Sequence, residues 1–366
     1  MTTRTINIIE LDSRDARFQT GIARYMDILA GHMPINIHTL RVIFFRSPQY
    51  RDIKITSDDT TVSVYVPAGF PEHTLNAAVL AMLGPRISGM QNIIVKSNCL
   101  GCESLAYMIR NQVYCRTIGV LHCLPHFAVP PSPLPPVSPF YNMDHIILVC
   151  DSGREYLNLV KNSRPFSVIY NGIAKPKITG KKPNDGVFRF IFANGLAAHK
   201  GLSRIVPAIK MVAARHDIEV MVIGGGELSE KFKAEISDLP IKIIGLLDNA
   251  DEIAGYYEMA DCALFASFSE ACSFAGIEAL AYNLPIVSTD AVGLVEMFGD
   301  AALYAKSDNN RFLDAAEYAA QMQRVITERR LRTKLGVRAY ARYLDRYTAA
   351  RMVRDTIKLY NKIIGE

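Results

Sequence analysis

Two glutamates eight positions apart, Glu270 and Glu278, are the side chains of this 366-residue chain best placed to do chemistry. The run before them, 262–266, is short and apolar, which is typical of a strand buried on both faces. The run from about 274 to 282 predicts a helix, so Glu270 falls in a strand-to-helix loop and Glu278 one turn inside the helix. In an open α/β sheet such a loop lies at the carboxyl end of a strand, where ligands bind.

This placement suits the binding of a phosphorylated sugar. A helix start offers unpaired backbone N–H groups and the positive end of a dipole, and both favour a phosphate. Glu278 could then accept hydrogen bonds from a ribose diol, while Glu270 could reach a sugar. The alternative is that Glu270 is a surface charge and Glu278 a solvated helix residue, since this spacing of glutamates is common.

Two further loops carry residues that suit a phosphate. The segment 190–201 predicts a strand and then a loop with Asn194, Gly195 and Lys200, where the lysine could neutralise a diphosphate and the glycine lets the backbone approach it. The segment 223–228 holds three glycines but lacks the third glycine of a dinucleotide fingerprint and the lysine of a P-loop. A solvent-exposed lysine and ordinary turn geometry are the respective alternatives.

In the first half of the chain, His122 and Gly21 are the corresponding candidates. His122 follows a predicted strand, 117–121, so it could contact a sugar hydroxyl or an acceptor. The alternative is a structural, hydrogen-bonded histidine. Gly21 begins the first predicted helix, where a phosphate or an acceptor group could meet the helix N-terminus. Asp12 and Ser13, in the preceding loop, are interpreted as caps of that helix.

Composition narrows the class of protein. The chain is 49% hydrophobic and 21% charged, which fits two globular domains. A net charge of +5 is too small and scattered for nucleic-acid binding and favours anionic partners only weakly. Seven cysteines argue against a disulfide framework and for a reducing compartment. The C-x-x-C at Cys99 and Cys102 lacks the second close pair of a zinc site, and incidental thiols are the preferred interpretation over a redox role.

The elements that must position these residues alternate between short apolar strands and amphipathic helices, which predicts a doubly wound α/β protein. We expect two Rossmann-like domains facing each other across a cleft. The first comprises residues 1–170 with a C-terminal helix, 345–366, and the second comprises 171–344. The stretch 125–139 contains seven prolines and predicts an extended loop.

The N-terminus begins a predicted strand almost at once and has no signal peptide. No apolar run approaches the ~20 residues of a membrane-spanning helix. These features predict a cytoplasmic protein, soluble or peripherally attached to the inner face of the membrane.

Several landmarks between about 144 and 305, in their order, resemble the retaining glycosyltransferases of family 4, which have the GT-B fold. The first half of the chain matches more loosely, chiefly through Gly21 and His122. The landmarks are Val168-Ile-Tyr-Asn-Gly-Ile173, His199-Lys-Gly201, Val222-Ile-Gly-Gly-Gly-Glu227, Ile243-Ile-Gly245, the segment 257–267, the Glu270/Glu278 pair and Leu284-Pro-Ile-Val-Ser-Thr289.

The resemblance implies that the domain 171–344 binds a nucleotide-sugar donor and that the first domain binds the acceptor. Glu270 would hold hydroxyls of the donor sugar, Glu278 the ribose diol, and Lys200 the departing diphosphate. His122 would lie near the donor sugar and the acceptor. Neither a metal nor another cofactor is expected, because a lysine and helix dipoles can neutralise the charge. The donor-binding residues expected are Glu278, Gly195, Ser273, Phe274, Ala275, Gly276, Gly225 and Gly21.

Two positions depart from the family pattern. Gly195 stands five residues before the lysine, where the family usually has an arginine that clamps the phosphate. The segment 271–273 replaces a glycine-rich stretch. Losing one charged donor of this kind costs ~10² to 10³ in rate. Another cation, Arg14, Lys175 or Arg204, could substitute.

We therefore expect a retaining, metal-independent hexosyltransferase that moves a sugar from a nucleoside-diphosphate donor to a hydroxyl of a glycan or lipid-linked acceptor, in surface polysaccharide synthesis. The acceptor and pathway rest on the resemblance alone. Two alternatives stay open. A non-catalytic nucleotide-sugar-binding protein of the same fold is supported only by Gly195. A nucleotide-sugar epimerase of this fold would need an acid/base pair in the first domain that the sequence does not reveal. The donor base, the sugar, the linkage and the oligomeric state are not specified by the sequence.

Overall fold

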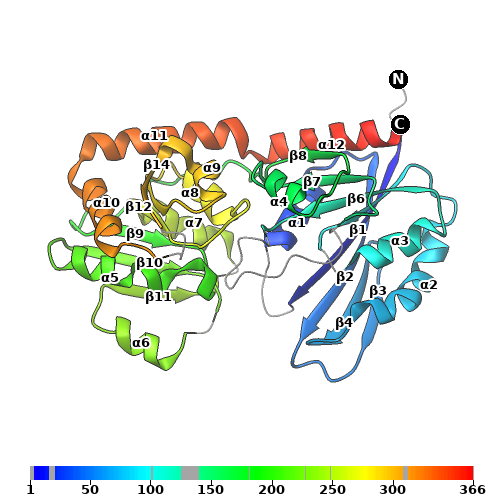
Figure 1. Ribbon diagram of the computed structural model, residues 1–366, viewed down its shortest axis with the longest axis horizontal. Helices are drawn as coiled ribbons and strands as arrows, with labels where there is room; N and C mark the ends of the chain where they lie inside the picture. The colour runs from blue at the N-terminus through cyan, green and yellow to red at the C-terminus, as the bar shows by residue number, and fades with distance from the viewer. Residues whose placement is uncertain are drawn as a thin grey trace. The chain divides into compact units, whose positions relative to one another are not determined.

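The chain forms two compact units in the computed structural model (Figure 1). The residues that the structure describes are 4–15, 21–99, 102–124, 140–180, 182–226, 228–247, 249–307 and 312–365, so the proline-rich segment lies outside them. Unit 1 comprises the chain up to Cys123, the segment that ends at Gly172, and the C-terminal segment from Ala349. Unit 2 comprises Leu124 and the segment from Ile173 to Thr348.

Unit 1 is built on an eight-stranded sheet in the order β3-β4-β2-β1-β5-β6-β7-β8. All neighbouring strands are parallel except the edge strand β3, which is antiparallel to β4. Central strands such as β5 are buried at every position, as expected where helices cover both faces of a sheet. The strands are β1 (Ile6–Asp15), β2 (Ile37–Ser47), β3 (Lys54–Ser57), β4 (Thr61–Pro67), β5 (Ile93–Ser97), β6 (Cys115–Leu121), β7 (His145–Leu148) and β8 (Phe166–Val168).

The helices of unit 1 include the last one of the chain, α12, which packs against α1 and β5. A buried ion pair between Lys96 on β5 and Glu10 on β1 lies close to Tyr360 of α12. Burial alone would lower the pKa of Lys96, but the carboxylate of Glu10, acting together with Tyr25 and Tyr360, holds that pKa above the usual value. The helices are α1 (Gly21–His32), η1 (Glu72–Leu75), α2 (Asn76–Ile87), α3 (Glu103–Arg110), α4 (Gly153–Leu159) and α12 (Ala349–Gly365).

The expected cap at Asp12 and Ser13 is wrong. Strand β1 continues to Asp15, and it pairs with β2 along its whole length, ending at the pair Asp15 and Arg46. Asp12 is therefore a fully buried strand residue at the carboxyl end of the sheet. Long pairing with a neighbouring strand extended the element beyond the apolar run that predicted it.

Unit 2 is a six-stranded parallel sheet in the order β11-β10-β9-β12-β13-β14. Numbered from its first strand, this is the 3-2-1-4-5-6 order of a doubly wound dinucleotide-binding fold. Helices α5 and α10 pack together on one face. The strands are β9 (Phe188–Phe192), β10 (Ile218–Ile223), β11 (Ile241–Gly245), β12 (Cys262–Phe265), β13 (Ile286–Thr289) and β14 (Ala302–Ala305).

The helices of unit 2 differ from the prediction at the end of the unit. A single helix was expected over 310–329, with the last helix of the chain beginning at 345, but α10 begins at Ala315 and α11 follows at Arg329. Between α11 and α12, the carbonyl group of Tyr347 accepts a hydrogen bond from Ile173 N at 3.0 Å. The helices are η4 (Ala198–Lys200), α5 (Leu202–Ala213), α6 (Glu230–Ile236), α7 (Ala250–Met259), α8 (Phe274–Ala281), α9 (Leu294–Phe298), η5 (Gly299–Ala301), α10 (Ala315–Thr327) and α11 (Arg329–Arg346).

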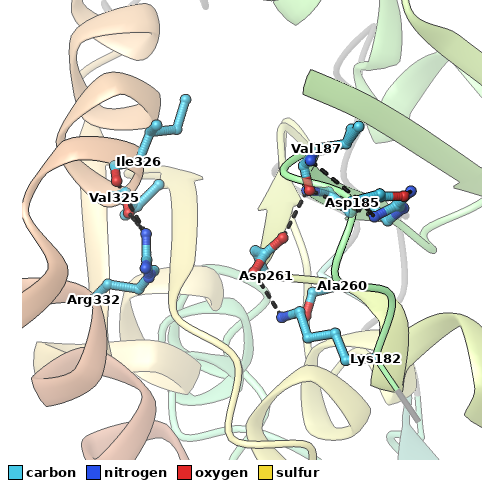
Figure 2. A network of polar contacts seen from close by, with 9 residues as sticks. Lys182, Asp185, Val187, Ala260, Asp261, Val325, Ile326 and Arg332 are labelled. Carbon is cyan, nitrogen blue, oxygen red and sulfur yellow. Dashed lines mark hydrogen bonds and ion pairs between the residues drawn. The ribbon is translucent and has the colours of Figure 1, made fainter. Parts of the chain in front are cut away.

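A polar network fastens the amino ends of β9 and β12 (Figure 2). Lys182 Nζ lies 2.6 Å from Asp261 Oδ1, and Asp261 Oδ2 accepts a hydrogen bond from Arg189 N at 2.8 Å. Apart from this network, Arg332 of α11 donates to two carbonyl groups in the last turn of α10. The contacts of Asp261 with Lys182 and Arg189 lie at the amino edge of the sheet, while the candidate site residues lie at the opposite, carboxyl edge.

Candidate functional site

The candidate site of unit 2 lies where the strand order reverses. Strands β9 and β12 are neighbours, and the connections that follow them lead to opposite sides of the sheet. A doubly wound sheet opens a crevice at this point, outside the carboxyl ends of the strands. Lys200 follows β9 and Glu270 follows β12, so the topology brings both predicted residues to that crevice.

Lys200 and Glu270 form a largely buried ion pair. The distance from Lys200 Nζ to Glu270 Oε1 is 2.6 Å, and the two side chains are 21% and 9% exposed. Asn194 Nδ2 and Ser267 Oγ donate to the same oxygen at 3.1 and 2.9 Å. Three donors therefore converge on Oε1 and fix the orientation of the carboxylate.

Asn194 connects this carboxylate to the start of α8. Its Oδ1 accepts a hydrogen bond from Ser273 Oγ at 3.2 Å, and Ser273 caps α8 by accepting from Gly276 N at 3.3 Å. One of the backbone amides predicted to bind phosphate is therefore engaged by the cap. Gly276 also packs closely, because a Cβ there would fall 2.4 Å from Met297 Sδ.

The carboxylate of Glu278 is held by a hydrogen bond from a tyrosine. Its Oε2 accepts a hydrogen bond from Tyr257 OH at 2.9 Å, and the residue is only 9% exposed. Tyr257 stacks on Tyr282 with ring centroids 5.1 Å apart. The alternative of a solvated helix residue is wrong, because α8 turns this position inward.

Gly195 and the triple-glycine segment join two loops at the crevice. Gly195 has a φ of +79°, a left-handed conformation that favours glycine. A Cβ on Gly224 would fall 2.4 Å from Gly195 Cα, so Gly224 must lack a side chain for the loops to meet. Leu196 N donates to Gly225 O at 3.0 Å across this contact. The glycine that replaces the family arginine thus has a structural reason of its own.

Of the three cations that could substitute for that arginine, Arg204 contacts the segment that leads to Glu270. Its Nη1 donates to Ala266 O at 2.8 Å, and its guanidinium lies 4.1 Å from the ring centroid of Phe268. Both contacts belong to the segment between β12 and Glu270. Lys175 lies over the ring of Tyr340 instead. The side chain of Arg14 lies outside the described residues.

The unit 1 candidates occupy the carboxyl edge of their own sheet. His122 follows β6, and its buried Nε2 has no hydrogen-bond partner among the described residues. Burial, and secondarily the charge of Lys96, lower the pKa of His122 to about 3, so the ring is neutral near pH 7. It meets Tyr25 of α1 edge-on, with centroids 4.7 Å apart. Gly21 begins α1 as predicted.

Sequence reasoning missed Asn98, which follows β5 at the same edge. Asn98 is 1% exposed, and both polar atoms of its amide lack a partner among the described residues. Asn98 N donates to Leu11 O at 2.9 Å, which ties the ends of β5 and β1 together. A single asparagine carries no sequence signal for such a position. Ser267 and Tyr257 were missed too, since their contacts with the two glutamates depend on packing.

Within the described part of the chain, no three His, Cys, Asp or Glu side chains are arranged to hold a metal ion. Over the same residues, no helix is long and apolar enough to cross a membrane.

Comparison with known proteins defines the class. Two doubly wound sheets of this kind form the GT-B fold, and the chain superimposes on the pneumococcal O-GlcNAc transferase GtfA, in complex with UDP and GlcNAc, with a TM-score of 0.76. That match covers 99% of this chain and 100% of the other at 12% identity. Residues 175–342 match the model of the family "Glycosyl transferases group 1".

The curated relatives share part of their length with this chain. D-inositol 3-phosphate glycosyltransferase of an Arthrobacter species is 26% identical over 50% of this chain and 44% of its own. The O-antigen chain mannosyltransferase RfbU of Salmonella typhimurium is 23% identical over 47% of this chain and 49% of its own. The chain thus spans about half the length of these relatives.

Proposed function

We propose that the protein is a retaining glycosyltransferase that transfers a sugar from a nucleoside-diphosphate donor to a hydroxyl group, without a metal ion. The observation that carries this proposal is the Lys200–Glu270 ion pair of 2.6 Å at the reversal point of the unit 2 sheet, joined through Asn194 to the cap of α8. A cation, a helix start and a carboxylate meet at one edge. These are the groups that a diphosphate sugar needs.

Each group has a distinct task in this proposal. Lys200 and the first amides of α8 stabilise the negative charge that grows on the departing diphosphate. Glu270 accepts hydrogen bonds from hydroxyls of the donor sugar. Glu278, which Tyr257 holds in place, accepts hydrogen bonds from the ribose diol. Lys200 exchanges its contact with Glu270 for the phosphate when the donor binds.

The reaction proceeds by attack of the acceptor hydroxyl on the same face from which the diphosphate departs. The acceptor proton passes to the departing β-phosphate oxygen, so the protein needs no general base. Its contribution is positioning and electrostatic stabilisation. His122, neutral at pH 7, is suited to hydrogen bond with a sugar hydroxyl rather than to supply a positive charge.

The acceptor is a glycan or a lipid-linked glycan in surface polysaccharide synthesis, at the inner face of the membrane. Two relations support this part of the proposal. The relative in Salmonella is an O-antigen chain mannosyltransferase, and the structural neighbour GtfA was determined with UDP and GlcNAc. The modest positive charge of the chain, +5, is compatible with an anionic lipid surface.

The first test is a thermal-shift panel of UDP-, GDP-, ADP- and dTDP-sugars. Stabilisation follows RT ln(1 + [L]/Kd), so a ~100 µM ligand at millimolar concentration raises the midpoint measurably. We expect one nucleotide family to stabilise the protein, Glu278→Ala to abolish that shift, and Glu235→Ala to preserve it. Glu235 is an exposed glutamate on α6 and serves as the matched control. No shift with any donor in the wild type would overturn the proposal.

A non-catalytic nucleotide-sugar binder remains the second candidate because of Gly195. It predicts the same thermal shift. The two are separated by incubating the stabilising donor with an acceptor panel and following release of the nucleoside diphosphate. The non-catalytic binder is favoured if, with every acceptor, the nucleoside diphosphate is released no faster than the donor hydrolyses in buffer alone.

A further inference from the structure

The two cysteines of the C-x-x-C segment face each other in unit 1. Cys99 Sγ and Cys102 Sγ are 3.1 Å apart, and neither cysteine is in a disulfide bond. Bonded sulfurs are ~2.05 Å apart, so closure requires a movement of about 1 Å. The sequence favoured incidental thiols at these positions, but the two sulfur atoms lie close enough to react with each other.

The surrounding backbone holds the pair in this arrangement. Ser97 Oγ donates to Cys99 O at 2.8 Å, and Cys102 N donates to the same carbonyl oxygen at 3.4 Å. Cys102 is buried at the N-cap of α3, where the positive end of the helix dipole favours a negatively charged sulfur. Cys99 is only partly buried. The Cys99 thiol is therefore accessible to a reactant, whereas the Cys102 thiol is buried.

A metal does not explain the pair. Two thiolates are too few for a structural metal site, which takes four ligands, and no cluster of three suitable side chains occurs among the described residues. In a reducing compartment, paired cysteines of this spacing undergo reversible oxidation rather than form permanent cross-links.

We propose that Cys99 and Cys102 form a reversible disulfide, as a modification site at the carboxyl edge of the unit 1 sheet. The oxidant is a small disulfide of the glutathione type. The Cys99 thiolate attacks one sulfur of that disulfide, forms a mixed disulfide and releases one thiolate. The Cys102 thiolate then attacks Cys99 Sγ and releases the second. The two protons lost by the cysteines go to the two released thiolates, so the products are one protein disulfide and two small thiols.

The location makes this modification relevant to ligand binding. Asn98, whose buried amide has no partner among the described residues, immediately precedes Cys99. The disulfide would join Cys99, which follows Asn98 after β5, to Cys102 at the N-cap of α3. Oxidation therefore constrains the backbone beside Asn98, at the edge of the unit 1 sheet where buried polar atoms have no partner among the described residues. The formation of the bond does not depend on the proposed transferase activity.

The test measures thiol oxidation in the intact chain. The native protein is equilibrated in a series of glutathione buffers from reducing to oxidising, quenched with N-ethylmaleimide, and examined by intact mass and peptide mapping. We expect two cysteines to lose reactivity together, to appear as a Cys99–Cys102 cross-link, and to recover with reduced glutathione. Cys123→Ser, which removes an exposed cysteine, should leave this transition unchanged.

Cys99→Ser should abolish the paired transition while circular dichroism confirms the fold. Two results would overturn the proposal. In the first, both cysteines stay reactive in the most oxidising buffer. In the second, Cys99 carries a stable glutathione adduct without a cross-link to Cys102.

Discussion

Each of the two units contains a doubly wound sheet, but the polar groups at the carboxyl edges of the two sheets differ in their hydrogen bonding. In unit 2 the polar groups at the edge bond to one another, with Lys200, Asn194 and Ser267 all converging on Glu270. In unit 1 the amide of Asn98 and the Nε2 of His122 have no partner among the described residues. The same architecture thus carries one edge that is internally satisfied and one that is left open.

The difference suits the two edges to different tasks: the edge of unit 2 to stabilising a charge, and the edge of unit 1 to binding a ligand. A satisfied network is preorganised, so it can stabilise the same charge in every reaction cycle. A buried polar group without a partner destabilises the fold by about 1–3 kcal/mol, which a ligand can recover on binding. The family match falls on 175–342, within unit 2, where the network is satisfied. This division motivates the following predictions.

Lys200→Ala should produce the largest effect, because it removes the one cation that contacts Glu270 among the described residues. We expect kcat/KM for glycosyl transfer to fall ~10² to 10³-fold, with partial rescue in Lys200→Arg. Lys210→Ala, on the exposed side of α5, is the control and should be neutral. Equal activity of wild type and Lys200→Ala in a steady-state assay would show that unit 2 is not the reactive edge.

His122→Gln should flatten the pH dependence of stability. The pKa of His122 is about 3 in the folded state against an ordinary value of 6.5, so between these limits the unfolded chain binds the extra proton. Stability is therefore full above pH 6.5 and falls with pH toward 3, by about 2 kcal/mol at pH 5. Denaturant unfolding at pH 5 and 8 checks this. In the His122→Gln variant, the difference in unfolding free energy between the two pH values should be smaller by this amount. Exposed His38→Gln should keep it.

Glu278→Ala should lower the affinity for the donor about 10- to 100-fold with little change in kcat. The reason is that Glu278 is assigned to the ribose and not to the reacting carbon. Tyr257→Phe removes only the hydroxyl that holds it and should have a smaller effect in the same direction. Calorimetric titration with the nucleoside diphosphate measures both. A variant in which kcat alone falls would place Glu278 in the chemistry.

The pair Asn98→Leu and Asn194→Leu tests the comparison itself. Asn194→Leu should lower the free energy of unfolding by about 1–3 kcal/mol, since Glu270 and Ser273 lose a partner. Asn98→Leu should leave stability unchanged or raise it by up to about 1 kcal/mol, because its amide makes no hydrogen bond to the described residues. Urea unfolding of both variants decides this. Equal losses would mean that the two edges do not differ.

Regular elements of unit 2 were predicted well because their sequences are strongly patterned. Strand β12 and the start of helix α8 lie at the residues expected. The edge strand β3 was missed because it is short, polar and largely exposed. Helix α11 was missed because its sequence is rich in arginine and has a weak apolar face, although it packs against α8. Tertiary packing stabilises such a helix more than its own sequence does.

The sequence by itself determined the α/β class, the GT-B fold and the match of residues 175–342 to a glycosyltransferase family model, together with the loops that carry Lys200, Glu270 and Glu278. These features follow from local periodicity and from residue types at fixed spacing. Only the tertiary structure decided which groups meet. The ion pair joins residues 70 positions apart, and Tyr257 reaches Glu278 across 21. Contacts of that kind depend on strand order and helix packing, so the satisfied edge of unit 2 and the open edge of unit 1 exist only in the folded chain.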